Sequence, residues 1–584
     1  MKKLIDLIQE ELVKAFTAAE MDPSYARVSV SNRPDLCEYQ CNGAMAAAKA
    51  YHKAPIQLAE AVVEKVTDHS VIGEIEAVKP GFINLKINPE FLADYLSKMQ
   101  NDEDLSVEKA KNPKTIIVDY GGANVAKPLH VGHLRSAIIG ESIKRMGRFM
   151  GHNMIGDVHL GDWGLQMGLI ITELQERHPE LVYFDESFTG EYPEEAPFTI
   201  SELEEIYPCA SGKSKEDEDY KKRALEATRE LQQGRRGYRA IWNVSVADLK
   251  KNYGNLDVHF DLWMGESDAQ EYIPDMVDYL KDNGYAHYDQ GALVVDVKEE
   301  TDTKEIPPCM ILKSDGAALY DTTDLATIIQ RMKLYKPDEI CYLADKRQEL
   351  HFVQCFRCAR KAKLVNDDTV LSFIGFGTMN GKDGKPFKTR EGGVMRLERL
   401  IGEINDEMYQ KIVENRSVKD TDARGTAQIV GLSAIKYGDL SNQASKDYVF
   451  DVERFTSFEG NTGPYILYTI VRTKSILGKY KEEGNELKKG ALLAPKSDSE
   501  KALMLSVSRF NGVVENAFEE KAPHKICAYI YELANEFNHF YHETKILSEQ
   551  DEARKASYLA LLDLVREVLE TCIDLLGFSA PERM

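Results

Sequence analysis

Two histidines three positions apart could stabilise negative charge on a phosphate group. His130 and His133 lie in the segment HVGH, where a loop leads into a long helical pattern. Residues with this spacing share a helix face, and the free N–H groups and dipole of a helix N-terminus favour an anion. The imidazoles could donate hydrogen bonds to phosphate oxygens as charge develops during attack on an α-phosphate. Gly132 would let a nucleotide lie against the backbone.

A second group of cations follows much later in the chain. The segment GKDGKPFKTR carries Lys382, Lys385, Lys388 and Arg390 on a glycine-containing loop after the strand-like run FIGFG. Lysines on such a loop can close over a triphosphate and neutralise the charge of a transition state. Each pattern also has a structural interpretation, since buried histidines need only one partner each and lysine-rich loops are common on surfaces. The strand and glycine loop before HVGH favour the functional interpretation.

The elements that would position these residues follow an α/β pattern. TIIVDY is a short apolar strand, GGAN a loop, and residues from about 134 to 149 repeat their apolar positions near 3.6 residues. Strand, glycine-rich loop and helix begin a nucleotide-type βαβ unit. Further strand candidates are ALVVDV, CMILK, EICYLA and VLSFIGFG, separated by helical stretches. This alternation predicts a Rossmann-type, doubly wound and mostly parallel sheet.

Four regions are predicted along the 584 residues. Residues 1–108 read as a small N-terminal α/β domain. Residues 109–375 form the Rossmann catalytic domain, with an insertion at about 170–255. Residues 376–459 hold the lysine-rich loop and a connecting region, and residues 460–584 are almost wholly helical, which predicts an all-α bundle.

Composition and charge limit the classes of protein. Hydrophobic residues make up 43% of the chain, and no apolar run is long enough for a membrane span. The first residues read as an amphipathic helix and not as a secretory signal, so we expect a cytoplasmic protein without a membrane partner. The formal net charge of −23 gives a polyanionic partner no support. However, residues 171–300 carry 30 acidic and 14 basic side chains, so much of the excess is confined to one segment.

The nine cysteines are odd in number and irregularly spaced, which indicates reduced thiols. His351, Cys355 and Cys358 in HFVQCFRC would share one helix face. Three candidate ligands are one fewer than a structural zinc site uses. We therefore predict no protein-bound metal and expect these cysteines to pack against a sheet.

The two cationic segments together resemble the HIGH and KMSKS signatures of class I aminoacyl-tRNA synthetases. HVGH matches HIGH, and Lys385-Pro-Phe-Lys388-Thr resembles a degenerate KMSKS. The surrounding segments are similar to those of bacterial arginyl-tRNA synthetases, in the same order. They are DYGGANVAKPLHVGHLRSAIIGE, HLGDWGLQMG, MGES, ALYDTTDLA, GKDGKPFKTREGG, FEGNTGPYILY and APERM.

This resemblance implies an arginine–tRNA ligase. ATP would activate L-arginine to arginyl-adenylate with release of pyrophosphate, and tRNA(Arg) would accept the arginyl group. The catalytic residues would be His130, His133, Lys385 and Lys388, and Mg²⁺ would come with ATP. The ATP-binding segment would comprise Ala123, Asn124, Val125, Ala126, Lys127, Pro128, Leu129, His130, Val131, Gly132 and His133.

The resemblance also implies the residues that hold arginine and tRNA. The arginine-binding set would be Asp119, Asn124, Tyr320, Asp324 and Gln348. A guanidinium has five donors in a planar fork, and a carboxylate can accept two of them. The tRNA-binding candidates are Phe82 and Asn84 in the N-terminal domain, which the family uses to touch the D-loop, and Arg472, Lys474 and Met584 in the helical C-terminal domain.

One departure from the family pattern lies just before HVGH. The family usually has Ser-Ser/Ala-Pro-Asn, where this chain has Gly121-Gly122-Ala123-Asn124. Loss of Ser and Pro predicts a more flexible loop and weaker preorganisation for the amino group of the substrate. Two other functions stay open, a class I synthetase for another amino acid and a non-catalytic tRNA-binding paralogue. A monomer is the family expectation.

Overall fold

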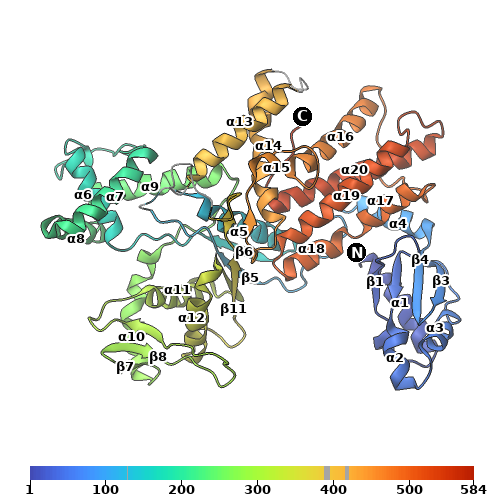
Figure 1. Cartoon of the computed structure of the whole chain (residues 1–584), viewed down its shortest axis with the longest axis horizontal. Helices are drawn as coiled ribbons and strands as arrows, with labels where there is room; N and C mark the ends of the chain where they lie inside the picture. The colour runs from blue at the N-terminus through green and yellow to red at the C-terminus, as the bar shows by residue number, and fades with distance from the viewer. Residues whose placement is uncertain (126, 128, 387–394, 415–419) are drawn as a thin grey trace.

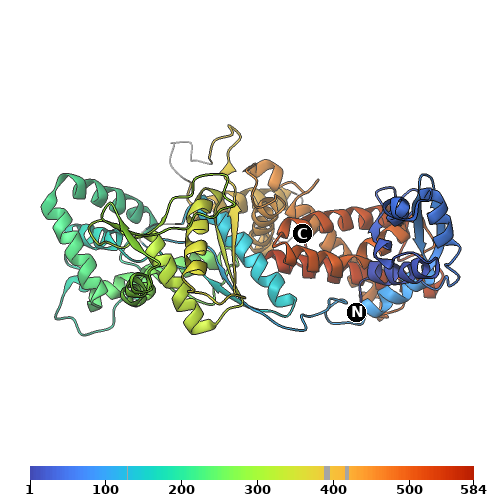
Figure 2. The same ribbon diagram turned by 90° about the horizontal axis from the view of Figure 1, so that it is seen from below.

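The computed structural model describes all 584 residues except 126, 128, 387–394 and 415–419. The molecule is elongated (Figure 1). The N-terminal domain lies at one end, a group of inserted helices lies at the other, and a parallel sheet lies between them. Figure 2, turned by 90°, shows the same succession. None of the described helices has the length and apolar character needed to cross a membrane.

The N-terminal domain is an antiparallel sheet with helices. The strand order is β1-β2-β4-β3. The strands are β1 (Val28–Val30), β2 (Tyr39–Cys41), β3 (Ile72–Val78) and β4 (Phe82–Ile87), and the helices are α1 (Leu4–Ala18), α2 (Gly43–Tyr51), α3 (Pro55–Val63) and α4 (Pro89–Gln100). On β4, Ile83, Leu85 and Ile87 are buried in the core, which leaves Phe82 and Asn84 together on the other face of the strand.

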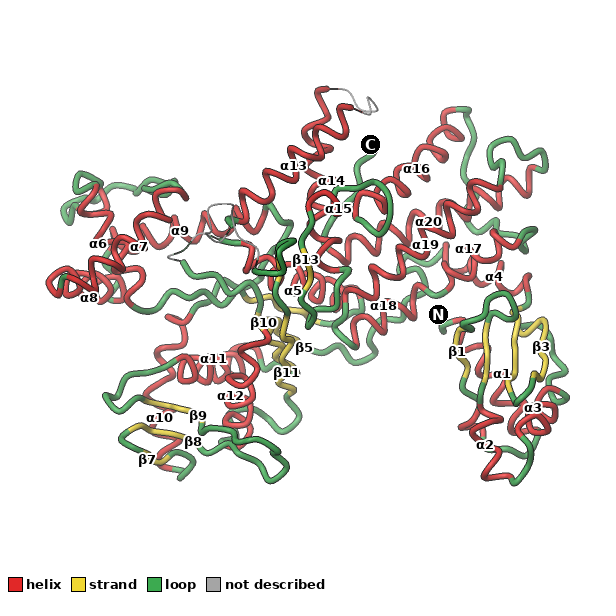
Figure 3. The backbone as a smooth tube through the Cα atoms, viewed as in Figure 1, coloured by secondary structure: helices red, strands yellow, loops and turns green. Residues whose placement is uncertain are grey.

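The central sheet has four parallel strands in the order β11-β10-β5-β6. It lies near the middle of the molecule in Figure 3, where β5, β10 and β11 are labelled. They are β5 (Thr115–Asp119), β6 (Asn153–Asp157), β10 (Glu339–Asp345) and β11 (Val370–Phe376). From β5 the chain continues to β6 on one side, and from β10 to β11 on the other. The strand order therefore reverses between β5 and β10, which is where doubly wound sheets bind their ligands, beyond the carboxyl ends of the strands.

Alternate residues of β5 belong to two different hydrophobic cores. Ile116 and Val118 pack in one core with residues of α5 (Val131–Phe149). Ile117 packs in the other with α11 (Tyr320–Tyr335) and α12 (Glu349–Lys361). Helices therefore cover both faces, and a strand buried on both sides reads as a continuous apolar run such as TIIV. This is the doubly wound arrangement that the sequence predicts.

Two of the strands predicted from sequence do not join this sheet. ALVV forms β8 (Ala292–Val295) and CMIL forms β9 (Cys309–Leu312), which pair antiparallel with each other. With β7 (His287–Asp289) they make a separate three-stranded sheet next to α10 (Ile273–Asp282). Of the four later strand candidates, EICYLA and VLSFIGF are the two that join β5 in parallel, EICYLA directly and VLSFIGF through it. The alternation of strands and helices predicts one sheet, which is wrong for these two strands. A short apolar run does not indicate which other strand it pairs with.

The predicted insertion is a helical layer, seen at the left of Figure 1. Its helices are α6 (Leu165–Arg177), α7 (Ile200–Glu216), α8 (Glu218–Gln232) and α9 (Arg236–Gly254). Residues 460–584 are helical as predicted and contain α16 (Gly463–Glu482), α17 (Asp498–Ser508), α18 (Phe510–Glu519), α19 (Pro523–Glu543) and α20 (Glu552–Leu576). The region before them, predicted to hold the lysine-rich loop and a connection, also contains α13 (Leu397–Glu414), α14 (Asp420–Leu440) and α15 (Val452–Phe455). A short parallel pair, β12 (Met379–Asn380) and β13 (Tyr448–Val449), precedes α15.

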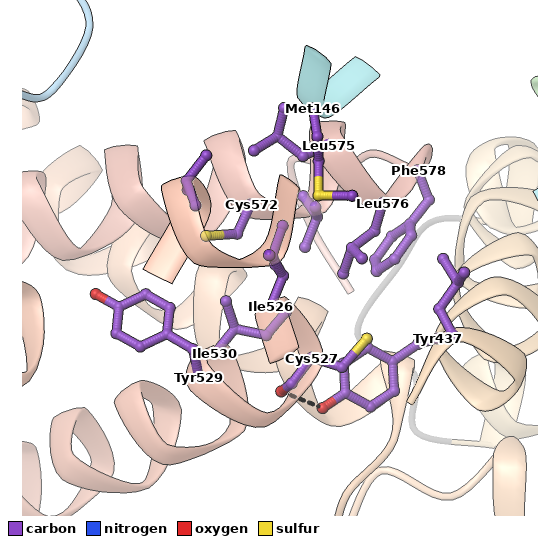
Figure 4. Close-up of a cluster of buried hydrophobic side chains, with 14 of the residues drawn as sticks. Met146, Tyr437, Ile526, Cys527, Tyr529, Ile530, Cys572, Leu575, Leu576 and Phe578 are labelled. Carbon is purple, nitrogen blue, oxygen red and sulfur yellow. Dashed lines mark hydrogen bonds between the residues drawn. The ribbon is translucent and has the colours of Figure 1, made fainter. Parts of the chain in front are cut away.

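A buried junction joins α5 to the C-terminal helices (Figure 4). Met146 of α5 meets Leu575 and Leu576 of α20, and all three are fully or almost fully buried. Tyr437 of α14 closes the cluster, and its hydroxyl donates to the carbonyl oxygen of Cys527 at 2.9 Å. The helix that begins at HVGH therefore ends in the core shared with the C-terminal helices.

Candidate active site

The two histidines of HVGH cap α5 reciprocally. His130 is the N-cap, and its Nδ1 accepts from the backbone N–H of Gly132 at 3.0 Å. The Nδ1 of His133 accepts from the backbone N–H of His130 at 3.1 Å. The ring centroids lie 4.0 Å apart. Because both Nδ1 atoms act as acceptors, each neutral ring carries its proton on Nε2.

Burial keeps both rings uncharged near neutral pH. It lowers the pKa of His133 to about 3, and the neighbouring His130 adds to this effect. Burial, together with the charge of Lys127, also lowers the pKa of His130. A Cβ at Gly132 would come within 2.7 Å of the His130 ring, so glycine at this position leaves room for that imidazole. The result is a pair of neutral rings whose Nε2–H groups serve as donors at a helix N-terminus.

Hydrogen bonds hold the GGAN loop that precedes the histidines. The backbone N–H of Gly121 donates to Ser136 Oγ at 2.8 Å. The carbonyl of Ala123 accepts from the N–H of Gly161 at 2.9 Å, and the side-chain amide of Asn124 donates to Gln166. Gly121 has a φ of +93°, which favours glycine. The flexibility expected from the sequence is therefore countered by pairing with the HLGDWG segment.

Asp119 lies at the carboxyl end of β5 and has an internal partner. One guanidinium nitrogen of Arg331 lies 2.7 Å from Asp119 Oδ2 and 2.8 Å from Asp157 Oδ2. Arg331 and Asp157 are almost completely buried, whereas the Asp119 side chain is 16% exposed. Arg331 thus ties the ends of β5 and β6 together and fixes the Asp119 carboxylate at the edge of the switch point.

The other predicted arginine ligands come from α11 and from the segment after β10. Tyr320 begins α11 and is 73% exposed, and Asp324 follows one turn later. Asp324 Oδ2 lies 2.6 Å from His351 Nε2, and Asp321 Oδ1 lies 2.7 Å from His351 Nδ1. Gln348 ends a short 3-10 turn directly after β10 and is exposed.

Two further residues of the candidate site are absent from the set predicted from the sequence. His159 lies in HLGDWG with a φ of +43°, and neither of its buried ring nitrogens has a hydrogen-bond partner among the described residues. Glu266 lies in MGES, and its N–H donates to the carbonyl of Leu160 at 3.0 Å. The pKa of Glu266 is raised to about 7, chiefly by burial and also by the nearby Asp162 and Asp324, while His159 acts in the opposite direction. Both segments contribute to the sequence analysis only through their resemblance to the family. The signal that could have identified these residues was the titratable side chain in each segment.

The lysine-rich segment returns to HVGH through the backbone. Val131 N–H donates to the carbonyl of Met395 at 3.0 Å, and Leu397 N–H donates to that of Leu129 at 3.2 Å. Lys385 is exposed on a tight turn, and its carbonyl accepts from Gly381 N–H at 2.8 Å. Lys388 lies outside the described residues. The two predicted signatures, remote in sequence, are therefore joined by pairing on the C-terminal side of the loop.

The remaining candidates for the ATP segment are mostly covered. Ala123, Val125, Leu129 and Val131 are buried. Lys127 Nζ lies 4.7 Å from the centroid of the Tyr207 ring on α7, a cation–π distance. Ala126 and Pro128 lie outside the described residues. In this segment the groups left to contact ATP are the backbone, Lys127 and the two histidines.

The predicted tRNA contacts differ in how far their side chains are already engaged. Asn84 is buried, and its amide oxygen accepts from Gln40 at 3.0 Å, whereas Phe82 beside it on β4 is half-buried. Arg472 donates to Asn538 at 2.7 Å.

Near the C-terminus, Lys474 is paired with Glu570 at 3.0 Å and with Glu582 at 2.8 Å. Met584 is partly buried against the main core. The pair between Lys474 and Glu582 fastens the C-terminal segment to α16.

The chain matches three families in succession along its length. Residues 96–452 match tRNA synthetases class I (R), catalytic domain. Residues 2–87 match the arginyl tRNA synthetase N terminal domain, and residues 466–584 match the DALR anticodon binding domain. The chain belongs to the arginyl-tRNA synthetase family. This confirms the family and the fold class predicted from the sequence, while the exact domain boundaries stay predictions.

Full-length relatives of the arginyl-tRNA synthetase family agree with this. The chain is 65% identical over 597 residues to an arginine–tRNA ligase of Agathobacter rectalis and 58% identical over 588 residues to one of Alkaliphilus oremlandii, each covering 100% of both chains. The solved arginyl-tRNA synthetase of Plasmodium falciparum superposes with a TM-score of 0.80 at 25% identity, over 100% of both chains. That of Thermus thermophilus gives 0.79 at 21% identity, covering 99% of this chain and 100% of that one, which supports the fold.

Proposed function

We propose that the chain is an arginine–tRNA ligase whose two chemical steps take place at the switch point beside His130 and His133. The arginine carboxylate attacks the ATP α-phosphate and forms arginyl-adenylate and pyrophosphate. The terminal ribose hydroxyl of tRNA(Arg) then takes the arginyl group and releases AMP. The observation that carries this assignment is the pair of neutral Nε2–H donors at the N-terminus of α5, because such donors stabilise charge on phosphate without a compensating proton transfer.

The arginine side chain is assigned to the acidic side of the pocket. Asp324, fixed by His351, offers a carboxylate to the guanidinium, and Tyr320 and Gln348 flank it. Glu266 adds a second carboxyl group close to Asp324. An amino acid without the guanidinium donors would leave these carboxylates without partners, which supports selection of arginine without an editing domain.

The backbone groups of the substrate are assigned to the end of β5. Asp119 and Asn124 are proposed to bind the α-ammonium group. The unpartnered ring nitrogens of His159 suit the carboxylate or the phosphate that it attacks. Lys385 and Lys388 would neutralise the pyrophosphate as it leaves, and Mg²⁺ enters as part of the ATP substrate.

The C-terminal helices are assigned to tRNA(Arg). Arg472 on α16, with Met584 at the end of the chain, would contact the anticodon region, and Phe82 on β4 would stack on an exposed base of the D-loop. Lys474 and Asn84 would contribute by positioning, because both are held by internal partners. We further assign a cytoplasmic monomer, since the two substrates and the tRNA can all be bound by one chain.

ATP–pyrophosphate exchange tests this function directly. Exchange is measured with each of the twenty amino acids, with and without total tRNA. Of the twenty amino acids, only arginine should support exchange, and the same preparation should attach arginine to tRNA(Arg). Exchange with another amino acid would overturn the pocket assignment, and no exchange under any condition would favour a non-catalytic tRNA-binding protein.

A further inference from the structure

A cluster of sulfur, imidazole and carboxylate groups lies directly behind Asp324. Cys309 comes from β9, Asp321 from α11, and His351, Cys355 and Cys358 from α12. The three cysteines are almost completely buried, whereas the Asp321 and His351 side chains are 19% and 23% exposed. One strand and two helices thus bring these groups together beside Asp324.

The contacts within this cluster are short. Cys309 Sγ lies 3.8 Å from Asp321 Oδ2, and Cys355 Sγ lies 3.8 Å from His351 Nε2. The ligand atoms of Asp321, His351 and Cys355 all lie within 4.8 Å of one another. The Cys355 thiol raises the pKa of Cys309, in keeping with the closeness of the two sulfur atoms. A purely apolar cluster of cysteines would not include an imidazole with a carboxylate on each ring nitrogen.

We propose that Cys309, Asp321, His351 and Cys355 bind one zinc ion. Tetrahedral zinc holds sulfur, nitrogen and oxygen ligands at about 2.0 to 2.3 Å, so that neighbouring ligand atoms are roughly 3.3 to 3.8 Å apart. Asp321, His351 and Cys355 each have a ligand atom within 4.8 Å of the others, and Cys309 Sγ lies 3.8 Å from Asp321 Oδ2, so zinc binding requires side-chain rotations that draw the four ligands onto one ion. Two thiolates with an imidazole favour zinc over magnesium or calcium, which prefer oxygen. The sequence alone offered three ligands because Cys309 and Asp321 lie on other elements.

The site has the outer contacts that metal sites require. With His351 Nδ1 on zinc, beside Asp321, Nε2–H is left to donate to Asp324, as metal-bound histidines usually do to a carboxylate. Cys355 Sγ, which lies 3.8 Å from Nε2, has to turn toward the Nδ1 side of the ring to reach the metal. The Cys358 thiol contacts the Cys309 sulfur. Zinc thereby holds the His351 ring neutral and fixes Asp324 toward arginine. This consequence for arginine binding, unlike the metal site itself, rests on the proposed function.

Metal content is the first test. The full-length chain, purified without a polyhistidine tag, is incubated with zinc, passed through gel filtration and analysed by mass spectrometry for metals. We expect about one zinc per chain in the natural protein and in Cys37→Ser, and less than about 0.2 in Cys309→Ser and Cys355→Ser. Cys37 is a matched control because it is buried in the N-terminal domain with Ser31 as its hydrogen-bond partner. A zinc-free natural protein, or full zinc in both cluster variants, would overturn the site.

Cobalt substitution covers the case in which the variants fail to fold. The chelator-treated natural protein is titrated with Co²⁺, and tetrahedral thiolate coordination should give visible bands and a near-ultraviolet charge-transfer band at one equivalent. Absence of these bands in folded protein would also overturn the site.

The link to arginine is read separately. Removal of zinc should raise the KM for arginine in pyrophosphate exchange while leaving the KM for ATP unchanged. An unchanged KM for arginine in zinc-free protein would overturn the coupling to Asp324. Loss of all exchange in zinc-loaded protein would instead count against the proposed function, and the metal content would still decide the site.

Discussion

At the scale of single residues, His133 has two roles that can be separated. Its Nδ1 caps the His130 N–H, and its Nε2–H is the proposed donor to phosphate. In His133→Asn the amide oxygen can replace Nδ1, but no atom reaches the Nε2 position, so we expect exchange to fall about 100- to 1000-fold, the usual loss for one transition-state donor. In His133→Gln the amide nitrogen reaches the Nε2 position, so part of the rate should return.

Thermal unfolding midpoints of both variants serve as the control for folding. Equal rates in His133→Asn and His133→Gln would show that the ring acts only through packing.

Glu266 should make arginine binding depend on pH. Its pKa of about 7 means that the carboxyl group ionises as the pH rises from 6 to 8, which adds a negative charge near Asp324. The cationic substrate should then bind more tightly, and the KM for arginine should fall by roughly fivefold, equivalent to about 1 kcal/mol. In Glu266→Gln this dependence should be lost. The measurement is the KM for arginine at several pH values, with the KM for ATP as the control. The same slope in Glu266→Gln would assign the effect to another group.

At the scale of the loop, Gly121 and Gly122 form a natural comparison. Both have positive φ, +93° and +58°, so alanine strains the backbone at either position. At Gly121 a Cβ would also approach the Phe260 ring to 2.7 Å, whereas nothing lies within 4 Å at Gly122. Displacement of the loop by about 1 Å can cost about 100-fold in rate, so we expect Gly121→Ala to lose far more exchange activity than Gly122→Ala.

The same comparison bears on the Gly121-Gly122-Ala123 segment, where this chain departs from the family pattern. Restoring serine at position 121 should weaken arginine binding, because the side chain meets Phe260 before it can help the substrate. Equal activity of the two alanine variants would show that the loop tolerates this contact.

Much of the order of helices and strands can be predicted from the sequence, because local patterns determine it. The strand, loop and helix around HVGH are confirmed, since periodicity and glycine placement act over few residues. The prediction that ALVV and CMIL join the parallel sheet was wrong, because strand pairing depends on segments that are distant in the sequence. For the same reason neither the ion pair of Arg331 with Asp119 nor the hydrogen bond from Gln40 to Asn84 is predictable from local patterns. His159 and Glu266 were missed because only folding brings HLGDWG and MGES together.

At the scale of the whole molecule, α5 connects the chemistry to the tRNA-binding part. Its first residues cap the active site, and its last turns enter the junction with α14, α19 and α20 (Figure 4). Ser142 on α5 donates to the carbonyl of Leu575 at 2.8 Å, so the contact includes a polar bond as well as packing. A rearrangement of the C-terminal helices on tRNA binding would therefore act on the helix that carries both histidines.

Lys436 at this junction should make the stability of the whole molecule depend on pH. It is fully buried, and its ammonium group donates to the carbonyl oxygens of Gly577 at 2.5 Å and Asp257 at 3.3 Å. Burial lowers its pKa to about 7, and the charge of Arg145 adds to this effect. An unfolded lysine titrates near 10.4, so between these values the unfolded state binds more protons and stability should rise with pH. From pH 7 to 9 the unfolding midpoint of the natural protein should therefore rise relative to that of Lys436→Met. The exposed Lys98→Met is the control, and parallel curves for all three proteins would contradict the assignment.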